Sequence, residues 1–270
     1  MQRPVAWILS IGNELLIGRI VNTNASWLGE KLTLDGFLVR RIITVPDSLE
    51  DIAEEVRRAA ERARVVITTG GLGPTYDDMT LQGVARAFGL KLVLNPEAKK
   101  MVDKFYSSRG LPLTEERLKM AYLPEGSKPI PNPVGAAPGC LLEVGDTLVV
   151  SLPGVPSEMK SMFEQYVEPV IKKIAPPLYT VECSLIIKGV PESGIAPYLK
   201  TIAKKNPAAY IKSHPKGHEL EKPVLDIRVL LSLPDKEQAL STARTIIGEI
   251  RSKASTLGGT IEREYCVIKS

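Results

Sequence analysis

The sequence has few of the residues that build disulfide frameworks, zinc sites or membrane spans. Its 270 residues include three cysteines and two histidines. The cysteines, at positions 140, 183 and 266, are scattered and odd in number, which predicts neither a disulfide framework nor a zinc site. We therefore expect a reducing, cytoplasmic location. The apolar run Val5–Leu9 is too short to span a membrane and lacks the cationic flank of a signal peptide.

The chain also lacks a strong excess of one charge. It has 35 Lys and Arg against 31 Asp and Glu, a formal net charge of +4. Basic residues occur in short pairs such as Lys172-Lys173 and Lys204-Lys205, and no run forms the stripe typical of nucleic-acid-binding surfaces. We expect neither a nucleic-acid nor a membrane partner. With 44% hydrophobic residues, the chain can bury the core of one large domain or of two smaller ones.

A glycine-rich stretch, Thr68–Thr80, is the most informative part of the sequence. It follows the apolar run Arg64–Ile67, which predicts a buried strand, and precedes Leu81–Phe88, which predicts a helix with Thr80 as its N-cap. Glycines let backbone N–H groups approach a phosphate, and a helix start favours an anion. The stretch fits neither the Walker A pattern nor the Gly-x-Gly-x-x-Gly fingerprint.

Two adjacent carboxylates, Asp77 and Asp78, lie near the end of this stretch. Carboxylates beside a bound phosphate would repel it unless a divalent cation lies between them. The pattern therefore predicts a phosphate ester bridged by Mg²⁺, Mn²⁺ or Co²⁺. The alternative interpretation is a glycine turn that only joins a strand to a helix.

Strands and helices alternate over the first part of the chain. Apolar patterns predict strands at 5–11, 37–45, 64–67 and 91–94, and helices that begin near 24, 48, 81, 96 and 114, the last running to 122. A hairpin over 140–152 and a helix to about 174 follow. This alternation predicts a mostly parallel α/β sheet, whose ligands bind beyond the carboxyl ends of its strands. Loops 12–18, 46–48 and 70–78 would share that edge.

The pattern changes after Pro176-Pro177. Predicted strands and helices then follow in the order strand, helix, strand, strand, helix, strand, which is typical of a small ferredoxin-like or KH-like α+β domain. KH folds bind nucleic acid through a Gly-x-x-Gly loop between helices, and no such loop occurs here. We predict a nucleotide- or phosphate-binding domain over 1–174 and an accessory domain over 175–270.

Five motifs together resemble the CinA (competence/damage-inducible protein A) family. They are Gly-Asn-Glu-Leu-Leu-x-Gly at 12–18, Asn-Thr-Asn-Ala at 22–25, Thr-Gly-Gly-Leu-Gly-Pro-Thr-x-Asp-Asp-x-Thr at 69–80, Asn-Pro-x-Gly-x-Ala-Pro-Gly at 132–139 and Leu-Pro-Gly-Val-Pro-x-Glu-Met at 152–159. The resemblance implies a first domain similar to the MoaB/Mog molybdopterin-binding domain, a three-layer α/β fold with helices on both faces of the sheet.

The resemblance also implies an activity, the metal-dependent hydrolysis of ADP-ribose or a similar nucleotide-sugar diphosphate. Two alternatives stay open: a non-hydrolytic module for a pterin or nucleotide phosphate, and adenylyl transfer to molybdopterin. Leu72 and Asp77 stand where Mog proteins commonly have Thr and Arg. The extra carboxylate favours metal-assisted pyrophosphate chemistry. Longer CinA-like proteins add a nicotinamide-mononucleotide deamidase domain, for which this chain ends too early, so we expect no deamidation.

The candidate site residues combine these motifs. The resemblance places the Mog loop aspartate at Asp78 and a second acidic position at Asp47. The catalytic candidates are Asp78, Asp77 and Glu14, and the metal candidates are Asp47, Asp78 and Asp77. The ligand-binding candidates are Gly70, Gly71, Gly73, Pro74, Thr75, Gly12, Asn13, Asn22, Asn24, Gly135, Pro138, Gly139, Pro153, Gly154 and Glu158.

Simple structural roles compete with these functional ones. Asp47 and Asn24 could cap helices, the glycines could only form turns, and Glu158 could complement a helix dipole. We also expect a homodimer, because two-fold dimers are the commonest soluble oligomers.

Overall fold

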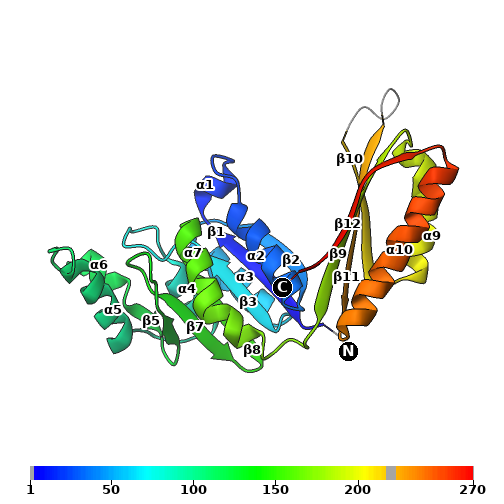
Figure 1. Cartoon of the computed structure of the whole chain (residues 1–270). Coiled ribbons are helices and arrows are strands. Elements are labelled where there is room, and N and C mark those ends of the chain that lie inside the picture. The colour runs from blue at the N-terminus through cyan, green and yellow to red at the C-terminus, as the bar shows by residue number, and fades with distance from the viewer. Residues whose placement is uncertain (1–2, 217–222, 270) are drawn as a thin grey trace. The chain divides into compact units, whose positions relative to one another are not determined.

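The computed structural model describes residues 3–216 and 223–269 and divides the chain into two compact units, Met1–Pro176 and Pro177–Ser270 (Figure 1). The first unit contains the glycine-rich stretch, and the second contains the C-terminal α+β pattern. No helix within the described ranges is long and apolar enough to cross a membrane.

A six-stranded sheet with strand order β2-β1-β3-β8-β7-β6 forms the centre of the first unit. The strands β1 (Val5–Ile11), β2 (Leu38–Val45), β3 (Val65–Thr69) and β8 (Thr147–Leu152) are parallel. The strands β7 (Gly139–Val144) and β6 (Lys128–Ile130) continue the sheet antiparallel. Because β3 lies in the middle and is covered on both faces, all five of its residues are buried.

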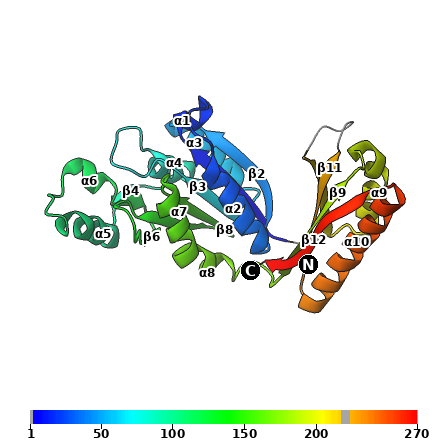
Figure 2. The same cartoon turned by 45° about the horizontal axis from the view of Figure 1, so that its top comes forward.

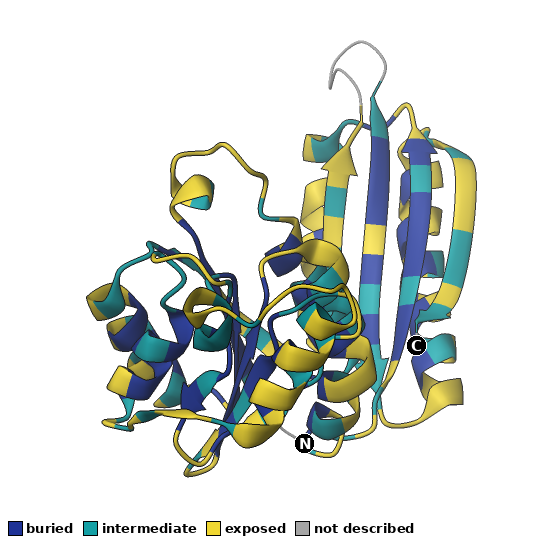
Figure 3. Cartoon of the chain, turned by 90° about the vertical axis from the view of Figure 1, so that its left-hand side faces the viewer, coloured by how far each residue is buried: buried dark blue, intermediate teal, exposed yellow. Residues whose placement is uncertain are grey.

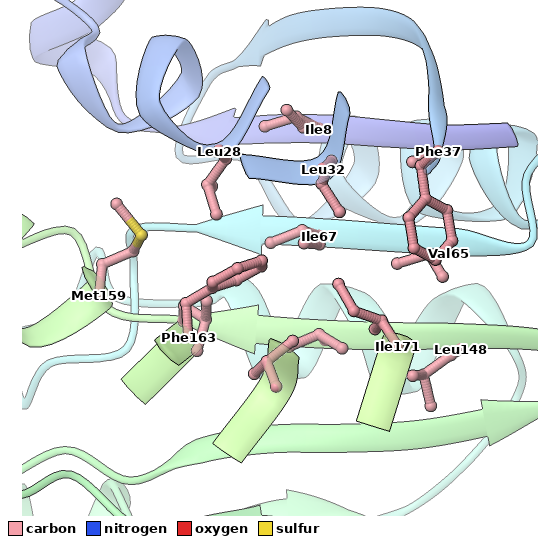
Figure 4. Packing of buried hydrophobic residues seen from close by; sticks show 14 of the residues in the cluster. Ile8, Leu28, Leu32, Phe37, Val65, Ile67, Leu148, Met159, Phe163 and Ile171 are labelled. Carbon is pink, nitrogen blue, oxygen red and sulfur yellow. The ribbon is translucent and has the colours of Figure 1, made fainter. Parts of the chain in front are cut away.

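Helices cover both faces of this sheet (Figure 2). On one face lie α2 (Thr23–Leu34), α7 (Pro156–Met162), the π-helix η1 (Phe163–Val167) and α8 (Glu168–Ile171), and on the other lie α3 (Leu49–Ala60) and α4 (Thr80–Ala87). Figure 4 shows Leu28 and Leu32 of α2 and Phe163 of η1 converging around Ile67 of β3. The predicted mostly parallel, three-layer MoaB/Mog-like α/β fold is confirmed.

An excursion between α4 and β6 packs around a small core that it shares with Leu72, Leu81, Ala137 and Cys140. It consists of β4 (Leu92–Leu94), α5 (Pro96–Ser107), α6 (Glu115–Lys119) and β5 (Tyr122–Pro124). The predicted helix over 114–122 is wrong at its end, because Tyr122–Pro124 pairs with β4 and the side chain of Leu123 is fully buried. We call residues 92–124 the arm.

The second unit is a four-stranded antiparallel sheet backed by two helices. Its elements are β9 (Tyr179–Lys188), α9 (Glu192–Lys205), β10 (Ala209–Pro215), β11 (Val224–Leu233), α10 (Lys236–Thr256) and β12 (Thr260–Lys269). The strand order β10-β11-β9-β12 is that of a ferredoxin-like fold, which settles the choice against a KH-like one. Figure 3 shows that buried positions concentrate on the central strands β9 and β11.

A disulfide bond joins Cys183 of β9 to Cys266 of β12. The scattered cysteines predict no disulfide framework, and they do not predict this single bond either. The two residues are 83 positions apart but lie directly opposite each other in the strand pairing, with Cα atoms 4.1 Å apart. The third cysteine, Cys140, is free, and burial raises the pKa of its thiol to about 12, so that it stays protonated and is a poor nucleophile.

Asp35 is a buried carboxylate at the C-terminal end of α2. Its side chain is 5% exposed, and its Oδ1 lies 3.3 Å from Nζ of Lys172. Its Oδ2 has no hydrogen-bond partner in the described part of the chain. Burial, and then repulsion by Glu168, raise the pKa of Asp35, although Lys172 and Lys31 partly offset both effects. A negative charge is also unfavourable at a helix C-terminus.

Replacing Asp35 by Asn should stabilise the protein near neutral pH. Because the folded-state pKa of Asp35 is raised, its contribution to stability is present below the unfolded-state pKa and is lost as the pH rises through the folded-state value. The neutral amide avoids that loss, so we expect Tm to rise by roughly 1–3 °C near pH 7 and the gain to shrink toward acid pH. Thermal scans over this pH range measure it. Glu30→Gln, on the exposed face of α2, is the control, and a pH-independent gain would contradict the assignment.

Candidate functional site

The carboxyl ends of β1, β3 and β8 open into a cleft of about 610 Å³ in the first unit. Its volume is ordinary for a small-molecule site, and its position is the one that parallel sheets use for ligands. The predicted site residues that line it are Gly12, Glu14, Asn22, Asn24, Asp47, Gly70, Gly71, Gly73, Pro74, Thr75, Asp77, Asp78, Pro153, Gly154 and Glu158. Asn13, Gly135, Pro138 and Gly139 are outside its lining.

Two glycines fix the course of the loop after β3. Gly70 and Gly71 have φ angles of +106° and +64°, which residues with a side chain rarely adopt. A Cβ at Gly70 would lie 2.2 Å from the backbone oxygen of Ile11, and one at Gly71 would lie 2.3 Å from Oγ1 of Thr80. The loop can therefore pack against β1 and α4 only if both positions are glycine.

Thr80 ties the loop to α4. Its hydroxyl donates a hydrogen bond of 2.8 Å to the carbonyl of Gly70, and its N–H donates one of 3.1 Å to the carbonyl of Gly71. The N-cap of α4 is Met79, so the predicted capping role of Thr80 is wrong. Thr80 thus occupies the carbonyls of Gly70 and Gly71. The amide N–H groups of Gly71, Leu72 and Gly73 make no hydrogen bond to any described residue, and all three residues line the cleft.

Thr75 organises the two aspartates that follow the glycines. Its N–H donates to Oδ2 of Asp78 at 2.9 Å, and its hydroxyl contacts Oδ1 of Asp77 and Oδ2 of Asp78, each at 2.5 Å. The bond from Thr75 is the main reason why the pKa of Asp77 is lowered. Both carboxylates therefore lie together at the cleft, and the lowered pKa of Asp77 favours its charged form.

Asp47, in the loop after β2, exchanges two hydrogen bonds with Asn13. Its Oδ2 accepts a hydrogen bond of 2.8 Å from the N–H of Asn13, and its own N–H donates to Oδ1 of Asn13 at 3.4 Å. This exchange joins α1 (Asn13–Leu16), the short helix after β1, to the loop after β2 and gives Asn13 a structural role. Ser48, not Asp47, caps α3. Over residues 3–216 and 223–269, no three His, Cys, Asp or Glu side chains form a metal-binding group, so Asp47, Asp77 and Asp78 do not converge as predicted.

Both asparagines of the second motif, predicted to bind ligand, make structural hydrogen bonds, and the alternative role of Asn24 as an N-cap is wrong. Asn22 is the N-cap of α2 and accepts from the N–H of Ala25 at 3.1 Å. Asn24 lies inside α2, and its Nδ2 donates to Oγ1 of Thr69 at 3.0 Å and to the carbonyl of Gly154 at 2.8 Å. Asn24 thereby fixes the loop after β8 to the end of β3.

Asn132, which we did not single out from its motif, shapes the remaining wall. Its Nδ2 donates to Oε2 of Glu158 at 2.7 Å, and its Oδ1 accepts from the N–H of Gly135 at 2.8 Å. A Cβ at Gly135 would lie 2.2 Å from Glu158. Gly135 is thus a packing position, and the buried Pro138 and Gly139 lead into β7.

The charge of the lining is one-sided. Among the residues that the structure describes, it includes the carboxylates of Glu14, Asp47, Asp77, Asp78 and Glu158 but no Lys, Arg or His. Apolar residues that the sequence did not indicate complete the lining, among them Ile20 and Val21, which are 57% and 81% exposed. The one sequence feature that could have indicated Ile20 and Val21 as lining residues is that they form an apolar pair in a loop, just after the glycine-containing motif at 12–18.

Comparison with known proteins agrees with this geometry. Residues 7–173 match the family described as the probable molybdopterin binding domain. A protein from Aeropyrum pernix is 57% identical over 97% of this chain and 98% of its own length, and one from Metallosphaera sedula is 46% identical over 96% and 97%. The crystal structure of "the protein CinA with unknown function" from Thermoplasma acidophilum is 43% identical, with a TM-score of 0.59, and covers 63% of this chain and 99% of its own.

The family match spans both the sheet and the cleft, from β1 to the end of α8. It also contains every loop that lines the cleft. The chain therefore belongs to the family of the probable molybdopterin binding domain, in which it is similar to CinA.

Proposed function

We propose that the first unit binds a phosphorylated pterin or nucleotide in the cleft, with the phosphate on the loop Gly70–Thr75. The observation that carries this proposal is the row of amides at Gly71, Leu72 and Gly73, which line the cleft and lack partners within the described structure. Adjacent N–H groups on a glycine-rich loop form a concave site for an anion. Membership of a molybdopterin-binding family supports a pterin as the ring system.

The acidic lining indicates how a phosphate would be tolerated. Asp77 and Asp78, held side by side by Thr75, would repel a phosphate in the absence of a cation. These residues fit a divalent ion that takes one or two carboxylates from the protein and its other ligands from water and phosphate, as Mg²⁺ commonly does. Asp47 fits less well, because Asn13 already donates to it.

A ligand screen by calorimetry tests the proposal. Molybdopterin and ADP-ribose would be titrated into the protein with Mg²⁺, Mn²⁺ or Co²⁺ and with a chelator. We expect binding of at least one of them to require the phosphate and to weaken when the metal is removed. If neither ligand binds under any of these conditions, the proposal fails.

The aspartate pair favours a second candidate function, hydrolysis of a nucleotide-sugar diphosphate such as ADP-ribose. A bound divalent ion would supply charge neutralisation and a more acidic water. The loop amides would hold the departing phosphate, and Glu14, in the same lining, is a candidate base. Chromatography of AMP and ribose phosphate after incubation with ADP-ribose distinguishes turnover from binding alone.

Under this second function, Asp78→Asn should lower metal-dependent turnover by about 10²-fold or more, because the amide removes charge where the diphosphate would be neutralised. The amide oxygen can still accept from Thr75, so the melting temperature should change little. Initial rates and thermal scans on one preparation measure both effects. Asp103→Asn, at an exposed position of α5, is the control. A stable Asp78→Asn protein with the wild-type rate and metal requirement would exclude this role.

A further inference from the structure

The loop Gly70–Thr75, which we call the glycine loop, is contacted by a cationic side chain on the side away from the large cleft. The last residue of α6 is Lys119, and its Nζ donates a hydrogen bond to the carbonyl of Thr75. A small hollow of about 20 Å³ is lined by Gly71, Leu72, Gly73, Asp78 and Lys119, among others. The same loop residues line the large cleft, so the loop separates Lys119 from the ligand site.

The arm fixes the position of Lys119. Thr114 is the N-cap of α6, and the two residues after Lys119, Met120 and Ala121, are 4% and 0% exposed. The backbone of Lys119 is therefore anchored between a capped helix and a buried segment. Its side chain, at a half-buried position, contacts the loop over a separation of 44 residues in sequence.

The neighbouring arginines of the arm are engaged elsewhere. Arg117 lies 4.2 Å from the ring centroid of Tyr106 and donates to the carbonyl of Pro112. Arg109 lies 3.7 Å from the ring centroid of Phe105 and donates to its carbonyl. Lys119 is the arm cation for which the structure, within its described ranges, records a direct bond to the loop.

We propose that Lys119 is the positioning residue that lets the glycine loop accept a phosphate, by holding the Thr75 carbonyl and partly offsetting the charge of Asp77 and Asp78. A charge-assisted hydrogen bond is stronger than a neutral one, so it restrains the segment that carries both aspartates. Besides the hydrogen bond from Thr75, the positive charge of Lys119 helps to lower the pKa of Asp77, since opposite charges attract each other even near a protein surface. The ligand would be an anionic phosphate ester, and this inference rests on the proposed function.

Two variants separate the charge of Lys119 from its bulk. Lys119→Met keeps most of the length of the side chain and removes its charge, whereas Lys119→Arg keeps the charge. Lys100→Met, at an exposed position of α5, is the matched control for loss of a surface cation. Calorimetric titration would use ADP-ribose with Mg²⁺, or molybdopterin if that is the ligand found. The control ligand is the same molecule without its phosphates.

We expect Lys119→Met to weaken binding of the phosphorylated ligand at least tenfold, more at low than at high salt. Lys119→Arg should restore most of the affinity, Lys100→Met should have no effect, and the affinity of the dephosphorylated ligand should not change. Equal affinities of the wild-type and Lys119→Met proteins for the phosphorylated ligand would overturn the inference.

A second measurement needs no ligand. The N–H groups of Thr75 and Asp78 are hydrogen-bonded within the loop, so their amide hydrogen exchange should become at least fivefold faster in Lys119→Met and stay near wild-type in Lys119→Arg. If the wild-type protein binds neither ligand, the proposed function fails, and the exchange rates still decide whether Lys119 holds the loop. Unchanged exchange in Lys119→Met would show that it does not.

Discussion

Gly70→Ala should abolish ligand binding and destabilise the first unit. The new Cβ would meet the backbone oxygen of Ile11 at 2.2 Å, and a backbone oxygen cannot rotate away as a flexible side chain can. The positive φ of +106° adds backbone strain. Together we expect about 3 kcal/mol or more of lost stability and at least a 100-fold loss of affinity, because β1 and the loop must separate. Thermal unfolding and calorimetric titration measure the two effects.

Gly89→Ala is the matched control for this prediction. Gly89 follows α4, has a φ of +65°, and would have no atom within 4 Å of an added Cβ. It therefore tests the cost of the φ angle alone, which we expect to be about 1 kcal/mol, with binding unchanged. If Gly70→Ala bound ligand as well as Gly89→Ala does, the loop would not be positioned by its contact with β1.

Removal of the disulfide should produce the largest stability loss in the second unit. Joining residues 83 positions apart constrains the unfolded chain, and the chain-entropy relation gives about 4.5 kcal/mol for a loop of that length. Cys183→Ala/Cys266→Ala should therefore unfold at a much lower temperature than the wild-type protein. The melting temperature of the wild-type protein should fall on reduction, whereas that of the double variant should not respond.

Cys140→Ala is the control, since Cys140 is the free cysteine of the first unit. It should lose a little packing and keep the full response to reductant. Thiol titration of the unfolded, non-reduced wild-type protein should find one free thiol. Three free thiols and a reductant-insensitive melting temperature would contradict the bond between β9 and β12.

The fold class could be predicted because its signals are local. Apolar runs indicate buried strands, apolar stripes indicate amphipathic helices, and their alternation limits the sheet to few topologies. The stretch after β3 lies at the cleft because every parallel strand ends at the same edge. The errors at Thr80 and over 114–122 concern element ends, where one hydrogen bond or one strand pairing decides the outcome.

The bonds that build the site could not be predicted from local pattern. Asn24 contacts Gly154 across 130 residues, Lys119 contacts Thr75 across 44, and Cys183 meets Cys266 across 83. Each contact depends on how loops and strands align after the core has formed. The motif around Asn24 indicated a role in the site but not that it positions the loop after β8.

The central claim, that the loop amides bind the phosphate, is tested most directly by nitrogen-15 NMR of the labelled protein during titration with the phosphorylated ligand and Mg²⁺. The account predicts that the amide resonances of Gly71, Leu72 and Gly73 shift first and most, and that the same ligand without phosphate leaves them in place. Saturable binding that shifts other resonances and leaves these three unchanged would contradict it.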